Sequence, residues 1–286
     1  MQFLEFFIWG SWLISFGGYL MAKNGALESP ASPEQVGAIF ATAGLASLLM
    51  PENFSLVQGK LEKSGMRKGF ACIFYGAPGT GKTETVYQIA RTTGRDIMMV
   101  DIAETKSMWF GESEKIIKEV FVRYRAFVKS SSVAPILLFN EADAVIGKRK
   151  DVTTGNVAQT ENAIQNIILQ EMENMEGIMI ATTNLTKNFD KAFERRFLYK
   201  IEFDKPGLDA KKMIWLSMMP SLSEKEAVQL AKSYDFSGGQ IENISRKHTV
   251  ESIISTEEPS FESIIGYCQS EHLHKDGPKR KIGYIS

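Results

Sequence analysis

The stretch of sequence that decides the fold is Gly76-Ala77-Pro78-Gly79-Thr80-Gly81-Lys82-Thr83, which matches every fixed position of the pattern G-x-x-x-x-G-K-[ST]. Apolar residues 71–75 precede it and predict a buried parallel strand, while residues 82–91 carry apolar side chains at helical spacing. Strand, glycine-rich loop and helix, in this order, are the context that a phosphate-binding loop requires. A glycine-rich turn that matches by accident is the alternative, and both flanking elements favour phosphate binding.

The loop residues predict a nucleotide site that also holds Mg²⁺. Glycines let consecutive backbone N–H groups turn inward around phosphates, and the N-terminus of the following helix adds a partial positive charge. We expect Lys82 to reach the β- and γ-phosphates and the Thr83 hydroxyl to bind Mg²⁺. The expected nucleotide-binding residues of this stretch are Gly76, Ala77, Pro78, Gly79, Thr80, Gly81, Lys82, Thr83 and Glu84.

The composition is that of an ordinary globular protein, with 286 residues, 44% hydrophobic and 23% charged, which suits one large or two modest domains. A formal net charge of −1 gives no overall basic field for nucleic acid or an anionic membrane surface. Cys72 and Cys268 lack motif spacing and predict free thiols in a reducing compartment, so we expect the nucleotide site to face the cytoplasm. His272 and His274 are expected in a solvated tail, and no structural metal is predicted.

From residue 52 the chain alternates between strand-like and helix-like runs, which predicts an α/β fold with a parallel sheet covered by helices on both faces. Expected strands are residues 71–75, 97–102, 133–140, 177–183 and 198–203, and expected helices are 54–65, 82–91, a helix from Ser113, and 163–175. After Pro206 only helical patterns follow, at residues 210–218, 224–233 and 240–254. We therefore expect a nucleotide-binding domain over residues 51–205, a helical lid over 206–272 and a basic tail over 273–286.

A second motif is the apolar run of residues 135–143, Pro-Ile-Leu-Leu-Phe-Asn-Glu-Ala-Asp, which ends in carboxylates. The carboxyl ends of strands in a doubly wound sheet converge beside the phosphate loop, so Glu141 is expected to polarise a water for attack on the γ-phosphate. Asn140 stands where most P-loop ATPases place an Asp that holds hydrated Mg²⁺. An amide can orient the waters of the ion without offsetting its charge, which predicts weaker metal binding or slow turnover. Capping of the following segment by Glu141 and Asp143 is the alternative.

Together these motifs resemble the AAA+ ATPases over most of residues 51–272, since several independent motifs occur in the right order. The resemblance implies ATP and Mg²⁺ as ligands. Residues 181–184, Ala-Thr-Thr-Asn, look like the sensor-1 segment, which implies that Asn184 orients the attacking water. A solvated turn asparagine is the alternative.

Residues 190–197 resemble the arginine-finger segment of the family, whose guanidinium stabilises transition-state charge on the nucleotide of a neighbouring subunit. The resemblance implies a self-assembled ring in which Arg195 or Arg196 has this role, and the spacing does not choose between them. Local pairing with Glu194 or Asp190 is the competing use.

Residues 107–115 look like pore loop 1, which implies that Trp109 grips a polypeptide client in the channel of the ring. A hydrophobic staple before the helix is the alternative. Residues 148–151 form a basic run that we interpret as a solvated loop, with a second pore loop as the alternative. Residues 236–242 resemble the turn into the last lid helix, which implies that Gly239 lies close to the adenine and ribose. No sensor-2 arginine is visible at this turn.

The resemblance implies an ATP-hydrolysing ring that remodels a macromolecular client, and no sequence signal is specific for nucleic acid. Because Asn140 is neutral, a nucleotide-binding switch or scaffold with little or no turnover remains the alternative function.

Residues 1–50 differ in kind from the rest. Residues 3–21 are almost continuously apolar, with Glu5 as their only charge, and would span about 28 Å as a helix, which predicts a membrane helix.

Parts of residues 6–51 resemble the first helix and the start of the second in nucleoside:proton symporters of the major facilitator superfamily, and such a fragment cannot transport by itself. We expect a fusion junction near Pro51. Alternatives are a native membrane anchor or, for residues 36–50, a buried helix of the nucleotide domain. The protein is then expected at a membrane if residues 1–50 are native and in the cytoplasm otherwise.

Overall fold

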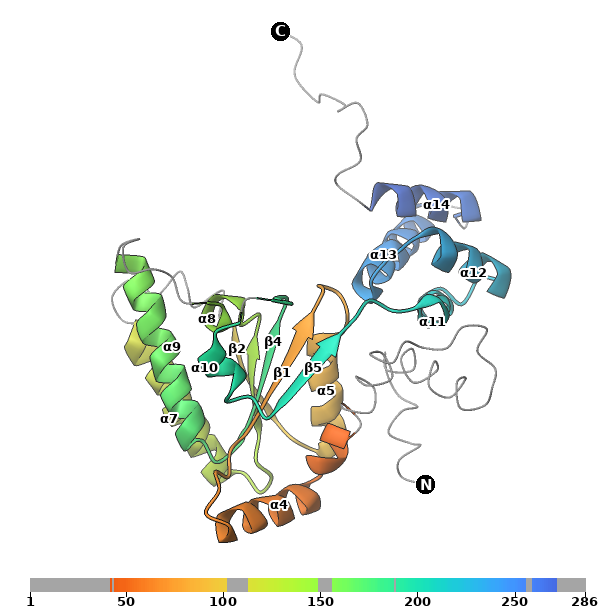
Figure 1. The fold of residues 1–286 in the computed structure, drawn as a ribbon. Helices are drawn as coiled ribbons and strands as arrows, with labels where there is room; N and C mark the ends of the chain where they lie inside the picture. The colour runs from red at the N-terminus through yellow and green to blue at the C-terminus, as the bar shows by residue number, and fades with distance from the viewer. Residues whose placement is uncertain are drawn as a thin grey trace.

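The computed structural model describes residues 42, 44–101, 113–148, 156–187, 189–255 and 259–271. They form a parallel sheet flanked by helices, followed by a helical unit beyond the carboxyl end of its last strand (Figure 1). The strands are β1 Phe70–Gly76, β2 Ile97–Asp101, β3 Ile136–Asn140, β4 Ile178–Thr183 and β5 Tyr199–Phe203. Their order is β2-β3-β4-β1-β5, and every neighbouring pair is parallel. The predicted α/β fold with a parallel sheet is confirmed.

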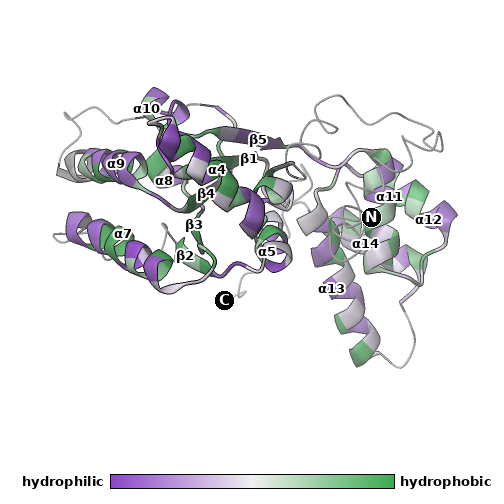
Figure 2. Ribbon diagram, turned by 90° about the horizontal axis from the view of Figure 1, so that it is seen from below, coloured by the Kyte–Doolittle hydropathy of each residue, from purple (hydrophilic) through white to green (hydrophobic). Residues whose placement is uncertain are grey.

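The helices of the sheet domain are α4 Pro51–Lys63, α5 Lys82–Thr93, α7 Ser113–Ser130, α8 Asp143–Ile146, α9 Asn156–Asn174 and α10 Lys191–Glu194. Side chains alternate across a strand, so the central strands β1, β3 and β4 each supply two hydrophobic cores. Ile73, Phe139 and Met179 face the core that α7, α8, α9 and α10 cover. Cys72 and Leu138 face the other core, which α5 covers. Central strands buried on both faces must be apolar throughout, and β1, β3 and β4 are coloured mainly as hydrophobic in Figure 2.

The apolar run before Pro51 ends inside the sheet domain. Leu45, Ala46 and Leu49 are buried in the same core as Phe54 and the strand residues of β1. This packing favours the alternative of a buried helix for the described end of residues 36–50. Because residues on both sides of Pro51 belong to one core, the core does not end at the expected fusion junction. The expected membrane helix at residues 3–21 lies outside the described residues, and no described helix is both long and apolar enough to cross a bilayer.

The helical unit consists of α11 Leu208–Met218, α12 Glu224–Ser233, α13 Gly238–Ile254 and α14 Phe261–Ser270. It has its own core around Trp215, Phe236 and Ile241, to which α14 adds Ile264 and Cys268. Helix α14 was not among the sequence predictions, although its apolar residues and the Ser260 cap carry the usual signal. Cys72 and Cys268 are free thiols in the structure, and both are buried.

Candidate nucleotide-binding site

The phosphate loop joins the end of β1 to the start of α5, and its backbone takes conformations that suit glycine. Gly76, Gly79 and Gly81 have φ of 141°, 73° and 91°, where side chains are strained. At Gly79 there is also no space, because a Cβ would lie 2.6 Å from the Ser237 hydroxyl oxygen of the lid. The loop can therefore keep its shape under the lid only with glycine at this position.

Lys82 is buried, with 7% of its surface exposed. Its ammonium donates hydrogen bonds to the carbonyl oxygens of Gly76, at 2.9 Å, and Ala77, at 2.7 Å. Burial lowers the pKa of Lys82 to about 8, against the opposing attraction of the Asp143 and Glu141 carboxylates. Lys82 thus lies close enough to Asp143 and Glu141 to interact with their charges. An anion bound in the loop would likewise favour the charged form of the Lys82 ammonium.

Asn140 connects the phosphate loop to two neighbouring strands. Its Oδ1 accepts a hydrogen bond from the Thr83 hydroxyl at 2.8 Å and another from the Thr182 hydroxyl at 3.0 Å. The Thr83 proton is engaged in this bond, so the lone pairs of the same oxygen are available to a cation. Oxygen donors of this kind suit Mg²⁺, although Asn140 supplies no negative charge. The residues present therefore fit an ion held by Thr83 directly and by Asn140 through water.

Glu141 follows β3 in a conformation that only a minority of residues adopt. Its φ is 51°, the only positive value among the described residues other than glycine, and such conformations cluster at functional sites. The Glu141 N–H donates to the Thr182 hydroxyl at 3.2 Å, and the Ala142 N–H donates to the Thr182 carbonyl at 2.8 Å. These bonds to β4 hold the turn, and the Glu141 side chain remains exposed.

Asn184 lies directly after β4, beside this turn, and its side chain is exposed. Its backbone N–H donates to Asp143 Oδ1 at 2.9 Å. The carboxyl ends of β3 and β4 thus bring the candidate base and the sensor-like asparagine to the same edge of the sheet.

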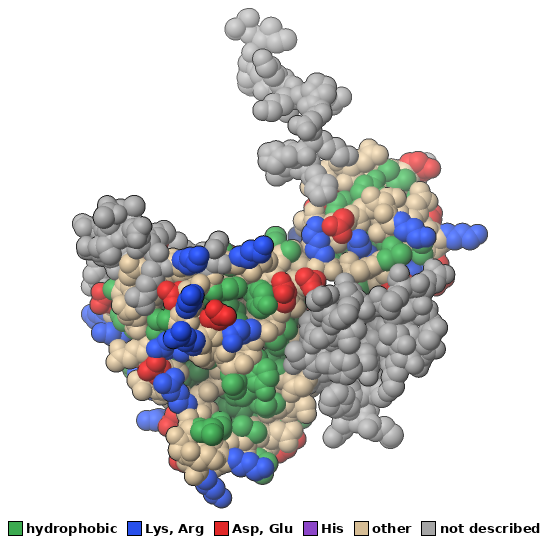
Figure 3. Space-filling model, in the orientation of Figure 1, with side chains coloured by type: hydrophobic (Ala, Val, Ile, Leu, Met, Phe, Trp, Pro, Cys, Tyr) green, Lys and Arg blue, Asp and Glu red, His purple; other side chains and the backbone are tan. Residues whose placement is uncertain are grey.

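The two arginines after α10 have different environments. Arg196 forms an ion pair with Glu173 of α9 and donates to the Ala192 carbonyl at 3.0 Å. Arg195 is exposed, and its side chain makes no ion pair within the described part of the chain. Neither arginine pairs with Asp190 or Glu194 among these residues. Figure 3 shows Lys and Arg side chains interspersed with Asp and Glu on the face that carries α9 and α10.

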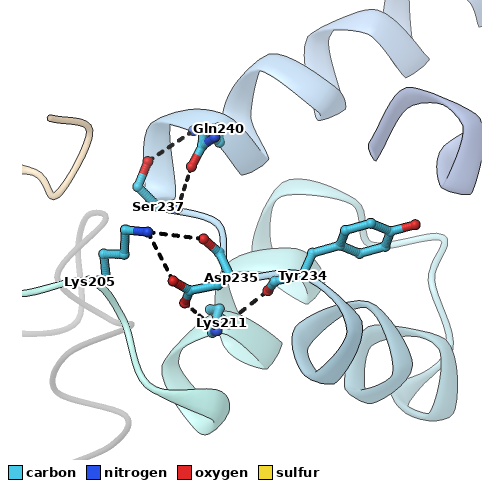
Figure 4. Close-up of polar contacts among 6 residues, drawn as sticks. All are labelled: Lys205, Lys211, Tyr234, Asp235, Ser237 and Gln240. Atoms are coloured by element: carbon cyan, nitrogen blue, oxygen red, sulfur yellow. Dashed lines mark hydrogen bonds and ion pairs between the residues drawn. The ribbon is translucent and has the colours of Figure 1, made fainter. Parts of the chain in front are cut away.

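The lid contacts the phosphate loop through the start of α13. The Gly239 N–H donates to the Gly79 carbonyl at 3.0 Å, and Ser237 and Gln240 form a capping box that begins the helix (Figure 4).

A carboxylate next to this turn ties it to the end of the sheet. Asp235 accepts from Lys205, which follows β5, at 2.9 Å, and from Lys211 of α11 at 3.1 Å (Figure 4). These hydrogen bonds lower the pKa of Asp235. The sequence interpretation did not include this link, because its members are 30 and 24 residues apart along the chain.

Two of the predicted features cannot be placed. Trp109 lies outside the described residues, and so does most of the basic run after Lys148. Conversely, the sequence interpretation missed Thr182 and gave Asp143 only a capping role. A pair of threonines that ends an apolar strand beside the phosphate loop is the signal that could have identified Thr182.

The family model described as "ATPase family associated with various cellular activities (AAA)" matches residues 72–205. This match lends no support to the symporter resemblance of residues 1–50. Among curated proteins, Protein CdcH of Halobacterium salinarum is 28% identical over 252 residues, which are 85% of this chain and 30% of that protein. Meiotic spindle formation protein mei-1 of Caenorhabditis elegans is 27% identical over 213 residues, or 70% of this chain and 41% of that protein. The chain thus spans less than half the length of these relatives.

A chain of the solved structure titled "Structure of E. coli MS115-1 HORMA:CdnC:Trip13 complex" has a similar fold. The TM-score is 0.63 at 18% sequence identity, and the match covers 80% of this chain and 86% of that chain. Residues 72–205 are thus similar in sequence to the AAA ATPase family, and they fold around a phosphate loop.

Proposed function

We propose that this domain binds ATP with Mg²⁺ and hydrolyses it. The observation that carries the proposal is the 2.8 Å hydrogen bond from the Thr83 hydroxyl to Asn140 Oδ1. It joins the helix that begins at the phosphate loop to the strand that Glu141 directly follows. A triphosphate bound in the loop would therefore lie against the edge of the sheet that carries the carboxylate.

Each residue then has a role that its environment allows. The loop N–H groups and Lys82 would bind the phosphates, and Thr83 and Asn140 would hold the ion. A bound Mg²⁺ would neutralise charge that develops on the β- and γ-phosphate oxygens. Glu141 accepts a proton from water as its oxygen bonds to the γ-phosphorus and the bond to the β,γ-bridging oxygen breaks. Asn184 orients that water.

Phosphate release by the full chain tests the catalytic assignment. Glu141→Gln removes the base but keeps the shape of the side chain, and we expect turnover to fall at least roughly 100-fold, with ATP still bound. Glu52→Gln is the matched control, since Glu52 is an exposed glutamate on α4. Equal rates for wild type and Glu141→Gln would remove Glu141 from the mechanism.

A second candidate function is a nucleotide-dependent switch with little or no turnover, and Asn140 favours it because a neutral amide leaves the charge of the ion uncompensated. Asn140→Asp restores a carboxylate that accepts from the same two threonines. Tight ATP binding without phosphate release in the wild type, together with turnover in Asn140→Asp, would favour the switch.

We also propose that copies of the chain assemble, so that Arg195 of one copy reaches the nucleotide of its neighbour. Arg196 is committed to Glu173 within its own chain, whereas Arg195 is exposed and available to the nucleotide of a neighbour. The client would be a macromolecule, with Trp109 as the proposed gripping residue.

Mixing two inactive variants tests this assembly. Arg195→Ala keeps Glu141, and Glu141→Gln keeps Arg195, so a mixed oligomer contains complete sites between unlike neighbours. We expect phosphate release to recover on mixing, and a larger species in size-exclusion chromatography with ATP. Arg196→Ala is the comparison, and because Arg196 pairs with Glu173 of its own chain, mixing it with Glu141→Gln should not be needed for its activity. Full activity of Arg195→Ala alone would exclude a role for Arg195 in a neighbouring site.

A further inference from the structure

Asp143, the first residue of α8, lies two positions after Glu141 and contacts the end of the neighbouring strand. Its Oδ1 accepts a hydrogen bond from the Thr183 hydroxyl at 2.6 Å and another from the Asn184 backbone N–H at 2.9 Å. The Thr183 oxygen in turn accepts from the Leu185 N–H at 3.1 Å. One carboxylate oxygen therefore organises the turn that follows β4.

This contact continues the pairing of β3 with β4 beyond the backbone ladder. The ladder ends at the pair Phe139 and Ala181. After that pair, Asn140 accepts a hydrogen bond from the Thr182 hydroxyl. Asp143 accepts hydrogen bonds from the Thr183 hydroxyl and the Asn184 backbone N–H. Together with the backbone hydrogen bond from the Ala142 N–H to the Thr182 carbonyl, these side-chain hydrogen bonds fix the two strand ends beyond the ladder.

The consequence falls on Asn184, whose own side chain is exposed. An exposed side chain points in a defined direction only when its backbone is held, and Asp143 holds the Asn184 N–H. Thr183 is buried, with 1% of its surface exposed, so its hydroxyl needs the partner that Asp143 supplies.

We infer that Asp143 is a positioning residue that acts through Asn184, setting the direction in which this asparagine meets the attacking water. The inference rests on the proposed hydrolysis of ATP at this site. According to this inference, turnover requires a hydrogen-bond acceptor at position 143 but not a negative charge.

The main competing role is electrostatic, because Asp143 also raises the pKa of Lys82 against the effect of burial. Two substitutions separate the roles. Asp143→Asn removes the charge but keeps an acceptor oxygen for Thr183 and Asn184, whereas Asp143→Ala removes both. Positioning predicts that Asp143→Asn retains turnover within a few-fold of wild type, while Asp143→Ala loses kcat on the order of 100-fold.

The experiment is a double-mutant cycle in the full chain, with kcat from phosphate release and ATP affinity from calorimetry. Because Asp143 acts through Asn184, Asp143→Ala should add little further loss to Asn184→Ala. ATP affinity should stay within a few-fold of wild type in all variants. Additive losses, or equal losses in Asp143→Asn and Asp143→Ala, would overturn the inference.

Two further variants guard against a purely structural effect. Thr183→Val removes the hydroxyl but fills the buried space, so it reports the same contact if Asp143→Ala does not fold. We expect a smaller loss of kcat that is also non-additive with Asn184→Ala. Ser223→Ala removes a comparable cap, that of α12 in the lid, and should leave kcat unchanged.

Hydrogen exchange of the Asn184 amide measures the contact without turnover. We expect faster exchange in Asp143→Ala than in wild type or Asp143→Asn, and unchanged exchange would overturn the inference. If wild type and Glu141→Gln release phosphate at the same rate while this exchange still responds to Asp143, the proposed function fails and the positioning contact stands.

Discussion

The two edges of the sheet use buried polar groups in opposite ways. At the amino edge, Arg95 donates to the carbonyl oxygens of Leu49 and Ala134. The Tyr124 hydroxyl lies 2.9 Å from the carbonyl oxygens of Pro135 and Ile178. At the carboxyl edge, hydrogen bonds between side chains, such as Thr83 to Asn140 and Thr183 to Asp143, add to the bonds with the backbone, and the Glu141 and Asn184 side chains remain exposed. Hydrogen bonds from buried side chains to the backbone stabilise the fold, whereas a network that includes exposed side chains can also contact a ligand.

The largest expected effect comes from the buried cation of the carboxyl edge. Lys82→Met keeps most of the side-chain volume but removes the ammonium, and removing one partner of a buried charge pair costs roughly 2–5 kcal/mol of binding. We expect ATP affinity to fall by about 100-fold or more in calorimetry. The midpoint of thermal unfolding without ATP should change little, since the loss of a desolvated charge offsets the loss of the hydrogen bonds to the Gly76 and Ala77 carbonyls.

The matched change at the amino edge should have the opposite effect, lowering the stability of the fold and leaving ATP affinity unchanged. Arg95→Met leaves the Leu49 and Ala134 carbonyls without their donor and removes a guanidinium 4.9 Å from the Phe54 ring centre. We expect roughly 2–4 kcal/mol less stability in urea unfolding, with ATP affinity of the folded protein unchanged. A weakened affinity without a loss of stability would contradict the division between the two edges.

The sequence predicts the sheet better than it predicts the network at the edge. Buried parallel strands such as β1 and β4 are continuously apolar, and the glycines of the phosphate loop mark where β1 ends. An apolar run such as residues 36–50 fits a membrane helix or a buried helix equally well, because only packing against Phe54 and β1 distinguishes them.

The proposed preference for Arg195 over Arg196 could not be derived from the sequence either. It depends on Glu173, which lies 23 residues before Arg196 on another helix. The contacts of Asp143 and Thr182 likewise require β3 to lie beside β4, and the order of strands in a sheet is not written in their sequences.

A moderate effect is expected when pH changes at the carboxyl edge. The pKa of Lys82 is about 8 in the folded chain, below its ordinary value of about 10.5. ATP should favour the protonated ammonium, so its affinity should fall about 10-fold per pH unit above pH 8. Between pH 8 and 10.5 the unfolded lysine binds more protons than the folded one, so the ATP-free protein should gain stability from this group as pH rises.

Lys82→Met separates this group from other titrations. Its ATP affinity, though weak, should lack the decline above pH 8, and its stability should lack the corresponding rise. An identical pH profile for Lys82→Met and wild type would assign the titration to another residue.

The smallest effect is expected at the lid, where the link to the sheet is a surface ion pair. Asp235→Asn weakens the contacts to Lys205 and Lys211, and exposed pairs contribute about 0–1 kcal/mol, so ATP affinity should weaken by about five-fold at most. Lys212→Gln removes another lid ion pair, with Glu224 of α12, and should have no effect on affinity. Added salt should reduce the difference between wild type and Asp235→Asn, because screening already weakens exposed charges. A difference that salt leaves unchanged would mean that Asp235 places Gly239 against Gly79 through hydrogen-bond geometry rather than through charge.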